Sequence, residues 1–264
     1  MPTGKPRTIL DAFGARQRRY VHLIGGGGKT SLMFALAHAL ADAGRSVLTT
    51  TSTRIGDPQP AESNRVVLAS DAASLVEALR EELLTRRHVT VAASRLEHEG
   101  KLLGLGVDQL DRLAEARVAD HVLVEADGAA GRSLKAHREH EPVVSARAGL
   151  VIAVIGADCL GMPMEDRHVH RAELLRERLG RAPGSVVTPE DVARIFFHRD
   201  GYLARIAKDS EVIVFVNKAG TAEALGEARR LAEALQRADQ EHRLGSVVVG
   251  DVRSGMYEEH SRGQ

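Results

Sequence analysis

Six consecutive residues near the N-terminus, Gly25-Gly26-Gly27-Gly28-Lys29-Thr30, have types and an order suited to binding phosphate. Glycine lets the backbone take conformations in which successive N–H groups point into one concavity. A lysine can reach the β- and γ-phosphates of a nucleotide, and a threonine hydroxyl can ligate Mg²⁺. We therefore predict that these residues and Ser31 bind a nucleoside triphosphate, with Lys29 as a catalytic group and Thr30 as a metal ligand.

The loop departs from the full phosphate-loop motif GxxxxGK[ST], because the first glycine of that motif would fall at Leu23. Its shorter form, GxxGK[ST], resembles the loop of Mur-type ligases. The dinucleotide fingerprint GxGxxG fits poorly, since counting from Gly26 its last glycine would fall at Ser31. The alternative is a glycine-rich turn with a surface lysine. A strand before the loop, a helix after it and the Lys-Thr pair favour nucleotide binding.

A second chemical signal is the run Val122-Leu123-Val124-Glu125-Ala126-Asp127-Gly128. An apolar strand that ends in acids is typical of a Walker B element, whose carboxylate holds Mg²⁺ directly or through water. Glu125 and Asp127 alternate, so their side chains should leave the strand on one face. We predict that both are catalytic groups and metal ligands, one serving the metal and the other orienting a water or an acceptor.

Two further stretches are candidates for contacts with the ligand. Thr49-Thr50-Thr51-Ser52-Thr53 closes a strand with five hydroxyl residues, and we expect Thr50 and Thr51 to contact the nucleotide, its metal or a second substrate.

Val216-Asn217-Lys218-Ala219-Gly220 resembles the guanine-reading NKxD element, with Gly220 in place of the acid. Asn217 and Lys218 remain predicted nucleotide contacts. Because the missing carboxylate would leave guanine donors unpaired, the sequence does not choose between ATP and GTP.

Other reactive side chains carry weaker signals. Arg132 and Lys135 follow the acidic strand end and suit either an anionic substrate or a solvated surface. The histidine pairs, His137 with His140 and His168 with His170, lack further ligands at metal-site spacing, so we interpret them as surface residues. The loop at 166–171 is rich in Arg and His and is suited to close over phosphates. The single cysteine, Cys159, is expected to be a small buried residue.

These side chains need a scaffold, and the pattern of apolar runs predicts one. We expect strands at 21–24, 46–50, 65–69, 88–93, 121–125, 150–155, 211–216 and 246–249, and helices at 31–43, 71–86, 107–117 and 222–238, with Asp71 as an N-cap. Strands that are apolar on both faces and separated by helices indicate a buried parallel sheet. The predicted fold is α/β, a doubly wound, mostly parallel sheet with helices on both faces, like that of P-loop NTPases. Its ligands should gather at the C-terminal ends of the strands.

The bulk composition limits the function classes. The chain has 264 residues, with 36 basic and 36 acidic residues, so neither nucleic acid nor an anionic membrane surface is an expected partner. One cysteine excludes an intrachain disulfide, and no apolar run is long enough to span a bilayer. We expect one cytoplasmic domain over residues 1–264, with a hairpin or loop at 95–106 and an irregular inserted segment at about 158–187.

Four blocks together resemble the selenium-dependent molybdenum hydroxylase accessory proteins, also called YqeC-like or selenium cofactor biosynthesis proteins. The blocks are residues 24–30, residues 47–55, residues 122–142, and Thr188-Pro189-Glu190-Asp191 with His198-Arg199-Asp200-Gly201. The resemblance implies a P-loop-type protein that helps to mature a selenium-containing molybdenum hydroxylase, with that enzyme or its cofactor as partner.

Three functions are therefore compatible with the sequence. The first is an accessory protein that binds ATP or GTP with Mg²⁺ and hydrolyses it during hydroxylase maturation. The second is a Mur-like ATP-dependent ligase or a small-molecule kinase, which the short loop suggests. The third is a non-catalytic chaperone whose partner binding is controlled by the nucleotide.

Overall fold

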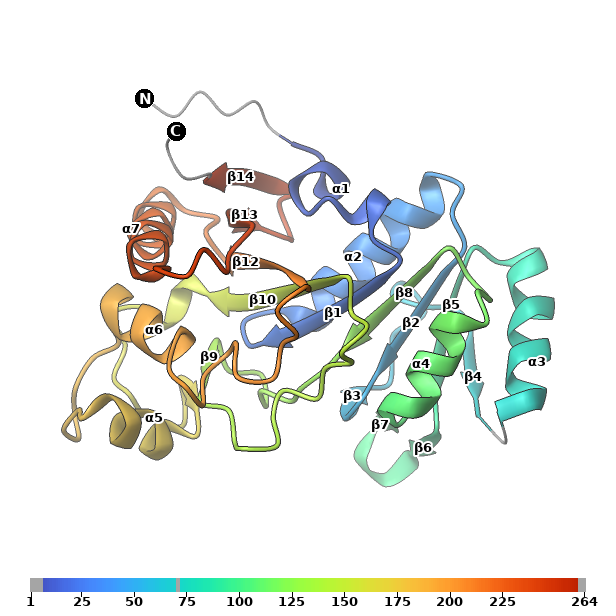
Figure 1. Ribbon diagram of the computed structural model, residues 1–264, viewed down its shortest axis with the longest axis horizontal. Helices are drawn as coiled ribbons and strands as arrows, with labels where there is room; N and C mark the ends of the chain where they lie inside the picture. The colour runs from blue at the N-terminus through green and yellow to red at the C-terminus, as the bar shows by residue number, and fades with distance from the viewer. Residues whose placement is uncertain (1–6, 70–71, 261–264) are drawn as a thin grey trace.

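The computed structural model describes residues 7–69 and 72–260, and a large twisted sheet runs through it (Figure 1). The order of the strands across this sheet is β14-β13-β12-β10-β1-β8-β2-β5-β4. Its strands are β1 Tyr20–Gly25, β2 Val47–Thr51, β4 Val66–Leu68, β5 His88–Ala92, β8 His121–Glu125, β10 Leu150–Gly156, β12 Glu211–Asn217, β13 Ser246–Asp251 and β14 Met256–His260. Every neighbouring pair is parallel except β13 and β14. The predicted parallel sheet is thus confirmed.

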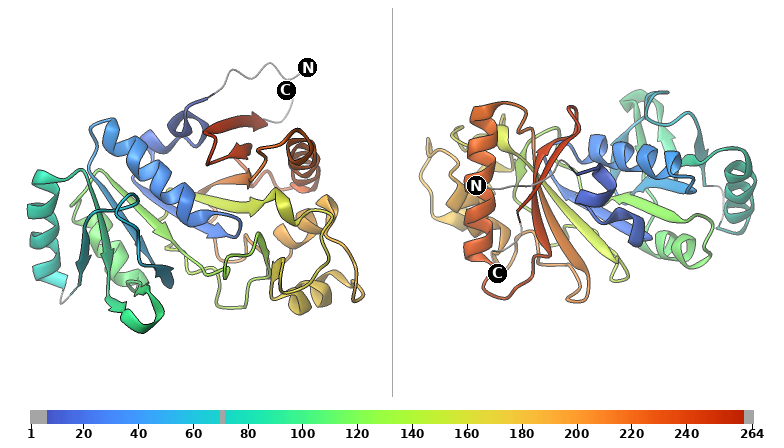
Figure 2. Two further views of the ribbon diagram at one scale, coloured as in Figure 1. Left: turned by 180° about the vertical axis from the view of Figure 1, so that it is seen from behind. Right: turned by 90° about the horizontal axis from the view of Figure 1, so that it is seen from above.

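Helices cover both faces of the sheet (Figure 2). They are α1 Ile9–Ala12, α2 Lys29–Asp42, α3 Ala72–Thr85, α4 Val107–Glu115, α5 Ala172–Leu179, α6 Pro189–Phe196 and α7 Ala222–Ala238. Alternate residues of one strand serve opposite faces: Ile152 of β10 packs in the cluster that contains α1 and α2, whereas Val151 packs with α5, α6 and α7. A third cluster joins α3 and α4 to β2, β5 and β8. The doubly wound α/β class follows from this arrangement.

Smaller elements lie around the carboxyl ends of the central strands. A three-stranded sheet is formed by β3 Arg54–Gly56, β7 Lys101–Leu103 and β6 Ser94–Leu96, so the hairpin expected at 95–106 exists and pairs with the chain after β2. A two-stranded sheet joins β9 Leu134–Lys135 to β11 Val169–His170. Short 3₁₀ turns occur at η1 Ala15–Gln17, η2 Glu97–Glu99 and η3 Ala157–Cys159. The segment predicted as an insertion at 158–187 contains β11 and α5.

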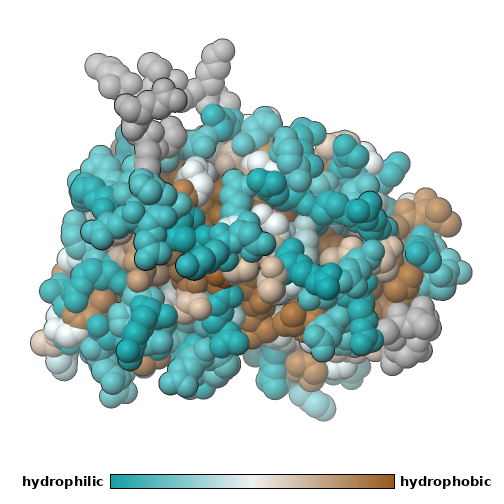
Figure 3. All heavy atoms as spheres, viewed as in Figure 1, coloured by the Kyte–Doolittle hydropathy of each residue, from teal (hydrophilic) through white to brown (hydrophobic). Residues whose placement is uncertain are grey.

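Several elements differ from the sequence prediction. The edge strand β14 and the helix α6 were not expected, and the predicted N-cap Asp71 lies outside the described residues. Hydrophilic residues cover most of the face seen in Figure 3, and hydrophobic ones show mainly in its middle. Among the residues that the structure describes, no helix combines the length and the apolar character needed to cross a membrane.

Candidate functional site

The glycine loop joins the end of β1 to the start of α2, and its glycines are required by close packing. Gly27 has φ +76°, and a Cβ there would lie 2.2 Å from the backbone nitrogen of Gly156. Gly28 has φ +117°, and its Cβ would lie 2.5 Å from Nδ2 of Asn217. Because other residues rarely adopt these φ values and would also collide with neighbours, only glycine fits both positions.

The first three amides of the loop donate to protein groups. Gly25 N–H donates to the Asp127 carboxylate at 2.9 and 3.1 Å, Gly26 N–H to the Val154 carbonyl at 2.9 Å, and Gly27 N–H to the Arg132 carbonyl at 2.8 Å. The sequence predicted that successive glycine amides would face a ligand. In this structure the amides that precede α2 hold the loop in shape, and the first turn of α2 presents the N–H groups that have no intrahelical acceptor.

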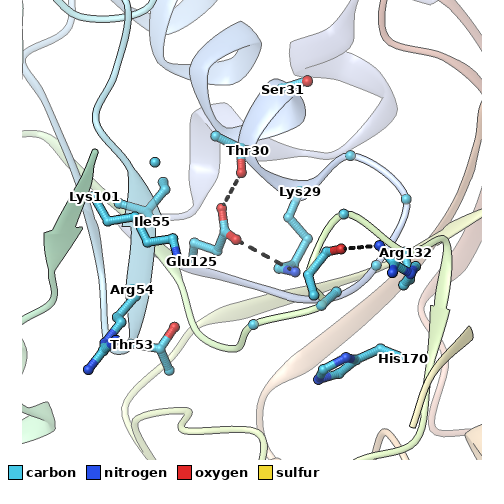
Figure 4. A pocket seen from close by; sticks show the side chains of 18 of the residues that line it. Lys29, Thr30, Ser31, Thr53, Arg54, Ile55, Lys101, Glu125, Arg132 and His170 are labelled. Carbon is cyan, nitrogen blue, oxygen red and sulfur yellow. Dashed lines mark hydrogen bonds and ion pairs between the residues drawn. The ribbon is translucent and has the colours of Figure 1, made fainter. Parts of the chain in front are cut away.

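A cavity of about 780 Å³ opens over the loop and the first turn of α2. Figure 4 shows Lys29, Thr30 and Glu125 between two other walls, one with Arg54 and Lys101 and one with Arg132 and His170. The lining residues are Gly26, Gly27, Gly28, Lys29, Thr30, Ser31, Thr53, Arg54, Ile55, Gly56, Lys101, Glu125, Gly128, Ala129, Ala130, Gly131, Arg132, Glu141, His170, Arg171 and Lys218. Most of the predicted loop residues and Glu125 therefore meet in one place.

Lys29 is buried, and its ammonium group contacts three oxygen atoms. Its Nζ lies 2.6 Å from the Gly25 carbonyl oxygen, 3.2 Å from the Asp127 carboxylate and 3.6 Å from the Glu125 carboxylate. Burial alone would lower the pKa of Lys29, but the two carboxylates raise it above its ordinary value. The residue is therefore a permanent cation at the floor of the cavity.

Thr30 and Glu125 form the pair best placed to hold a metal ion. The Thr30 hydroxyl donates to Oε2 of Glu125 at 2.7 Å, and both residues line the cavity. Burial raises the pKa of Glu125, although Lys29 and Thr30 oppose this effect. Hydroxyl and carboxylate oxygens are ligands that Mg²⁺ prefers, so this pair fits the predicted metal.

Asp127 has a different environment. Its side chain is fully buried, accepts from Gly25 N–H and from Nε2 of His137 at 2.7 Å, and forms an ion pair with Nζ of Lys135 at 3.3 Å. It does not line the cavity. Burial alone would raise the pKa of Asp127, but Lys29 and His137 lower it, so the carboxylate stays ionised. The geometry makes Asp127 a holder of the glycine loop.

The network behind Asp127 overturns two surface interpretations. Lys135 is completely buried between Asp127 and Glu141, with its Nζ 3.3 Å from each carboxylate. His137 is also buried, and its ring stands edge-on to Tyr202. Burial lowers the pKa of both groups, against the opposing effect of Asp127. Neither residue is a solvated surface group, because the loop after β8 folds back across the end of the sheet.

The threonine run at the end of β2 mostly bonds within the protein. Thr51 donates to the Glu125 carbonyl oxygen at 2.7 Å, and Thr50 is buried. Neither residue lines the cavity, whereas Thr53 does. Thr50 and Thr51 thus lie beneath the site, and their predicted contact with a ligand stays a prediction.

Asn217 and Lys218 lie at the end of β12 beside the glycine loop. The Asn217 amide donates to the Gly27 carbonyl oxygen at 2.8 Å and accepts from Val252 N–H at 3.0 Å. Lys218 lines the cavity and contacts Ser133 at 2.7 Å and Asp158 at 2.8 Å. Asn217 therefore braces the loop from behind.

Next to this pair, a carboxylate occupies the space left by Gly220. A Cβ at Gly220 would lie 2.7 Å from Oδ2 of Asp251, which is within the reach of an aspartate's own oxygens. Oδ1 of Asp251 accepts from Arg253 N–H at 2.7 Å. A carboxylate from the end of β13 thus lies where a side chain at Gly220 would lie.

The histidine pairs and Cys159 are the remaining candidate residues from the sequence. His170 and Arg171 line the cavity, while His140 is exposed. Among the described residues, no group of three or more histidines, cysteines and acids could hold a metal ion. Cys159 is buried as expected, and burial raises the pKa of its thiol to about 12.

Comparison with known proteins identifies the family. The family model described as YqeC protein matches residues 21–173. The protein YqeC of Escherichia coli (strain K12) is 30% identical over 249 residues, which cover 94% of this chain and 93% of that protein. The chain belongs to the YqeC family. Its glycine loop, acidic strand end and Arg171 all lie within the matched residues.

Two solved structures are similar to this YqeC-family chain at a distant level. The hydrogenase maturation factor HypB from Archaeoglobus fulgidus is 11% identical, with a TM-score of 0.39 and coverage of 94% of this chain and 88% of that chain. A GTPase from Pyrococcus abyssi, in its apo form, is 13% identical, with a TM-score of 0.36 and coverage of 90% and 92%.

Sequence reasoning missed several lining residues of the YqeC-family site. Arg54 and Lys101 reach the cavity from β3 and β7, and Glu141 reaches it from the loop before β10. Arg54 directly follows the threonine run, and both Arg54 and Glu141 fall within the sequence blocks that carry the family resemblance, so signals for these two residues were available. Lys101 lies far from the glycine loop along the chain, and only the fold brings it to the loop.

Proposed function

We propose that this YqeC-family chain is a cytoplasmic protein that binds and hydrolyses a nucleoside triphosphate with Mg²⁺. The observation that carries the proposal is the convergence of Lys29, Thr30 and Glu125 at the first turn of α2 on one cavity. We further propose that it serves the maturation of selenium-dependent molybdenum hydroxylases. That part rests on the family resemblance of its sequence blocks alone.

The residues divide the work as follows. Free amides of the first turn of α2 and the Lys29 ammonium group bind the phosphates, where the helix dipole adds positive potential. Thr30 and Glu125 would hold Mg²⁺, which would neutralise developing charge on the phosphate oxygens. Asp127 is a positioning residue, because it holds Gly25 and Lys29 in place.

We propose guanine as the preferred base. Guanine presents two adjacent donors, N1–H and the N2 amine, which one carboxylate can accept together, whereas adenine has no such pair. Oδ2 of Asp251 lies beside Gly220, two residues along from the cavity residue Lys218. Asp251 is half-buried and lies at the end of β13, the strand next to β12.

The test is Mg²⁺-dependent GTP turnover and binding in Lys29→Ala, Glu125→Gln and Asp127→Asn. Lys29→Ala should lose turnover to background. Glu125→Gln should keep a native thermal midpoint and lose most of its turnover. Asp127→Asn removes the carboxylate that Lys29 and Lys135 share and leaves Lys29 only Glu125 and Lys135 only Glu141 as partner charges, so it should lower stability by about 3 kcal/mol. Wild-type turnover in Lys29→Ala would refute the proposal.

A second candidate function is transfer of the terminal phosphate to an acceptor. One observation favours it: a second cavity of about 480 Å³ adjoins the first and shares Ala130, Arg132, His170 and Arg171 with it. Simple hydrolysis needs only water. Nucleotide consumption that depends on an added acceptor would distinguish transfer from hydrolysis.

A further inference from the structure

The wall between the two cavities is built from Arg132, His170 and Arg171, which line both. This wall is joined to the phosphate loop, because the Arg132 carbonyl accepts the Gly27 N–H at 2.8 Å. Figure 4 shows Arg132 and His170 on the side of the cavity away from Arg54 and Lys101. A molecule bound against the wall would therefore lie beside the phosphates of a nucleotide.

The charge around this wall is strongly unbalanced. The first cavity is lined by the cations Lys29, Arg54, Lys101, Arg132, Arg171 and Lys218 and by the acids Glu125 and Glu141. The whole chain, in contrast, has equal numbers of basic and acidic residues. The basic excess is thus local to the cavity, and a cavity of one sign concentrates ligands of the opposite sign.

Arg132 is the cation whose charge is least compensated. Its guanidinium donates to the backbone carbonyl oxygens of Ala130 and Asp166, and within the described residues it has no ion pair. Arg171 pairs with Glu141, but Glu141 also pairs with Lys135. Among the described residues, the ion pairs of these two guanidinium groups thus involve one shared carboxylate, Glu141, while the acids Asp166 and Glu173 line only the second cavity. The side of the wall that faces the first cavity therefore suits a bound dianion.

The backbone at the same place is held in unusual conformations. Ala130, Arg171 and Lys218 have φ values of 48°, 63° and 64°, and all three line the first cavity. They are three of the five non-glycine residues with positive φ in the described chain. Such conformations cost free energy and tend to persist where a site requires them.

We propose that Arg132, His170 and Arg171 bind the phosphate monoester group of a second substrate, whose body lies in the second cavity. This rests on the proposed function, because it assumes that a nucleotide fills the first cavity. A phosphate monoester carries a charge of roughly −1.5 to −2 at neutral pH and three acceptor oxygens, which match two guanidinium groups and an imidazole. The second cavity adds Arg138, Asp166, Glu173 and Leu174, a mixed lining that suits a polar body.

The test is a calorimetric titration of glycerol 3-phosphate into protein saturated with Mg²⁺ and a non-hydrolysable GTP analogue. Arg132→Gln should weaken binding of the phosphate monoester about tenfold or more, and this loss should exceed the loss for the nucleotide analogue, whose phosphates are held by Lys29 and the first turn of α2. Arg167→Gln is the matched control, since Arg167 lies three residues before His170, is exposed and lines neither cavity. Arg132→Lys keeps the charge and should retain part of the affinity.

The outcomes separate the two proposals. Equal losses in Arg132→Gln and Arg167→Gln, or malonate binding as tightly as the phosphate monoester, would overturn the phosphate site. Competition between the phosphate monoester and the nucleotide analogue would overturn it too. If no nucleotide binds, the proposed function fails, but the titration without nucleotide still tests the wall. Movement of the His170 ring resonances in the wild-type protein provides a readout that needs no variant.

Discussion

At the scale of single residues, Glu125 and Asp127 lie two positions apart in the sequence but have different surroundings. Glu125 faces the cavity and bonds Thr30, whereas Asp127 faces the protein and bonds Gly25, His137 and Lys135. The sequence spacing predicted that both would point to one face. They do lie on one side of the loop, yet the chain after Asp127 covers it and leaves only Glu125 open to a ligand.

Asp251 is the residue whose substitution should change base preference. Asp251→Asn should weaken GTP binding roughly tenfold to a hundredfold. The carboxylate has two oxygens that can accept from the two N–H donors of guanine, whereas the asparagine amide has one oxygen and an NH₂ group, which is itself a donor. The same change should strengthen binding of XTP, since xanthine has an oxygen where guanine has its N2 amine. Titration of both nucleotides with Mg²⁺ measures this, with ATP as the control ligand whose affinity stays constant. Unchanged GTP affinity would show that Asp251 does not contact the base.

The position of Asp251 beside Gly220 could not be predicted from the sequence. The sequence analysis found Asn217 and Lys218 by pattern and recorded Gly220 as a missing acid. The replacement is far along the chain, at the end of a later strand, and only the pairing of β12 with β13 brings it alongside. Lys135 and His137 are similar cases, because nothing local to a lysine or a histidine reveals that a later segment will bury it.

At the scale of elements, the glycine loop at the end of β1 is held in place by packing against β10 and β12. Gly27→Ala should destabilise the protein by at least about 3 kcal/mol and abolish nucleotide binding, since the new Cβ would meet the Gly156 backbone 2.2 Å away. Gly161→Ala is the matched control. Gly161 has nearly the same φ, +72°, but open space around its Cβ, so a loss of about 1 kcal/mol is expected. Urea unfolding compares them, and similar losses would mean that φ strain alone matters.

The elements that the sequence predicted best are those that are buried on both faces. Strands such as β10 are apolar throughout because helices cover each side, and this pattern needs no knowledge of the partners. The strand β14 was missed because it lies at the sheet edge and contains Glu258 and Glu259. The helix α6 carried a readable signal, a Thr188 N-cap followed by Pro189 and an acid at Asp191, which the sequence analysis did not use.

At the scale of the whole molecule, acidic and basic residues are equal in number, but basic residues are concentrated around the main cavity. The chain has equal numbers of acidic and basic residues, yet the main cavity is lined by six lysines and arginines against two glutamates. No calculation of net charge could show this. It depends on residues from five separate segments, which are β3, β7, the loop after β8 and the residues that follow β11 and β12, meeting over one loop.

The stability of the whole fold should depend on pH through His22. Burial lowers the pKa of this fully buried histidine to about 3, well below the roughly 6.5 of an unfolded chain. Because the unfolded state binds the proton more readily, the contribution is complete above pH 6.5 and is lost as the pH falls towards 3. Between pH 7 and pH 5 this costs about 2 kcal/mol. His88, whose pKa burial lowers to about 4, acts in the same direction.

Urea unfolding of the wild-type protein and of His22→Phe at pH 7 and pH 5 measures this contribution. The variant keeps a ring in the place of the imidazole and removes the titration, so its stability should fall by about 2 kcal/mol less over that interval. A variant that lost as much stability as the wild-type protein would rule out His22 as a source of the acid sensitivity.

The three glycine amides that donate inside the protein also affect the entropy and the rate of ligand binding. Gly25, Gly26 and Gly27 each donate to a group of the protein itself, namely Asp127, Val154 and Arg132. The entropy of ordering this loop is therefore lost during folding and not at the moment of association. Such a preorganised receptor binds nearly as a rigid body, and its association rate is governed by diffusion and attraction of opposite charges rather than by a wait for the loop to close.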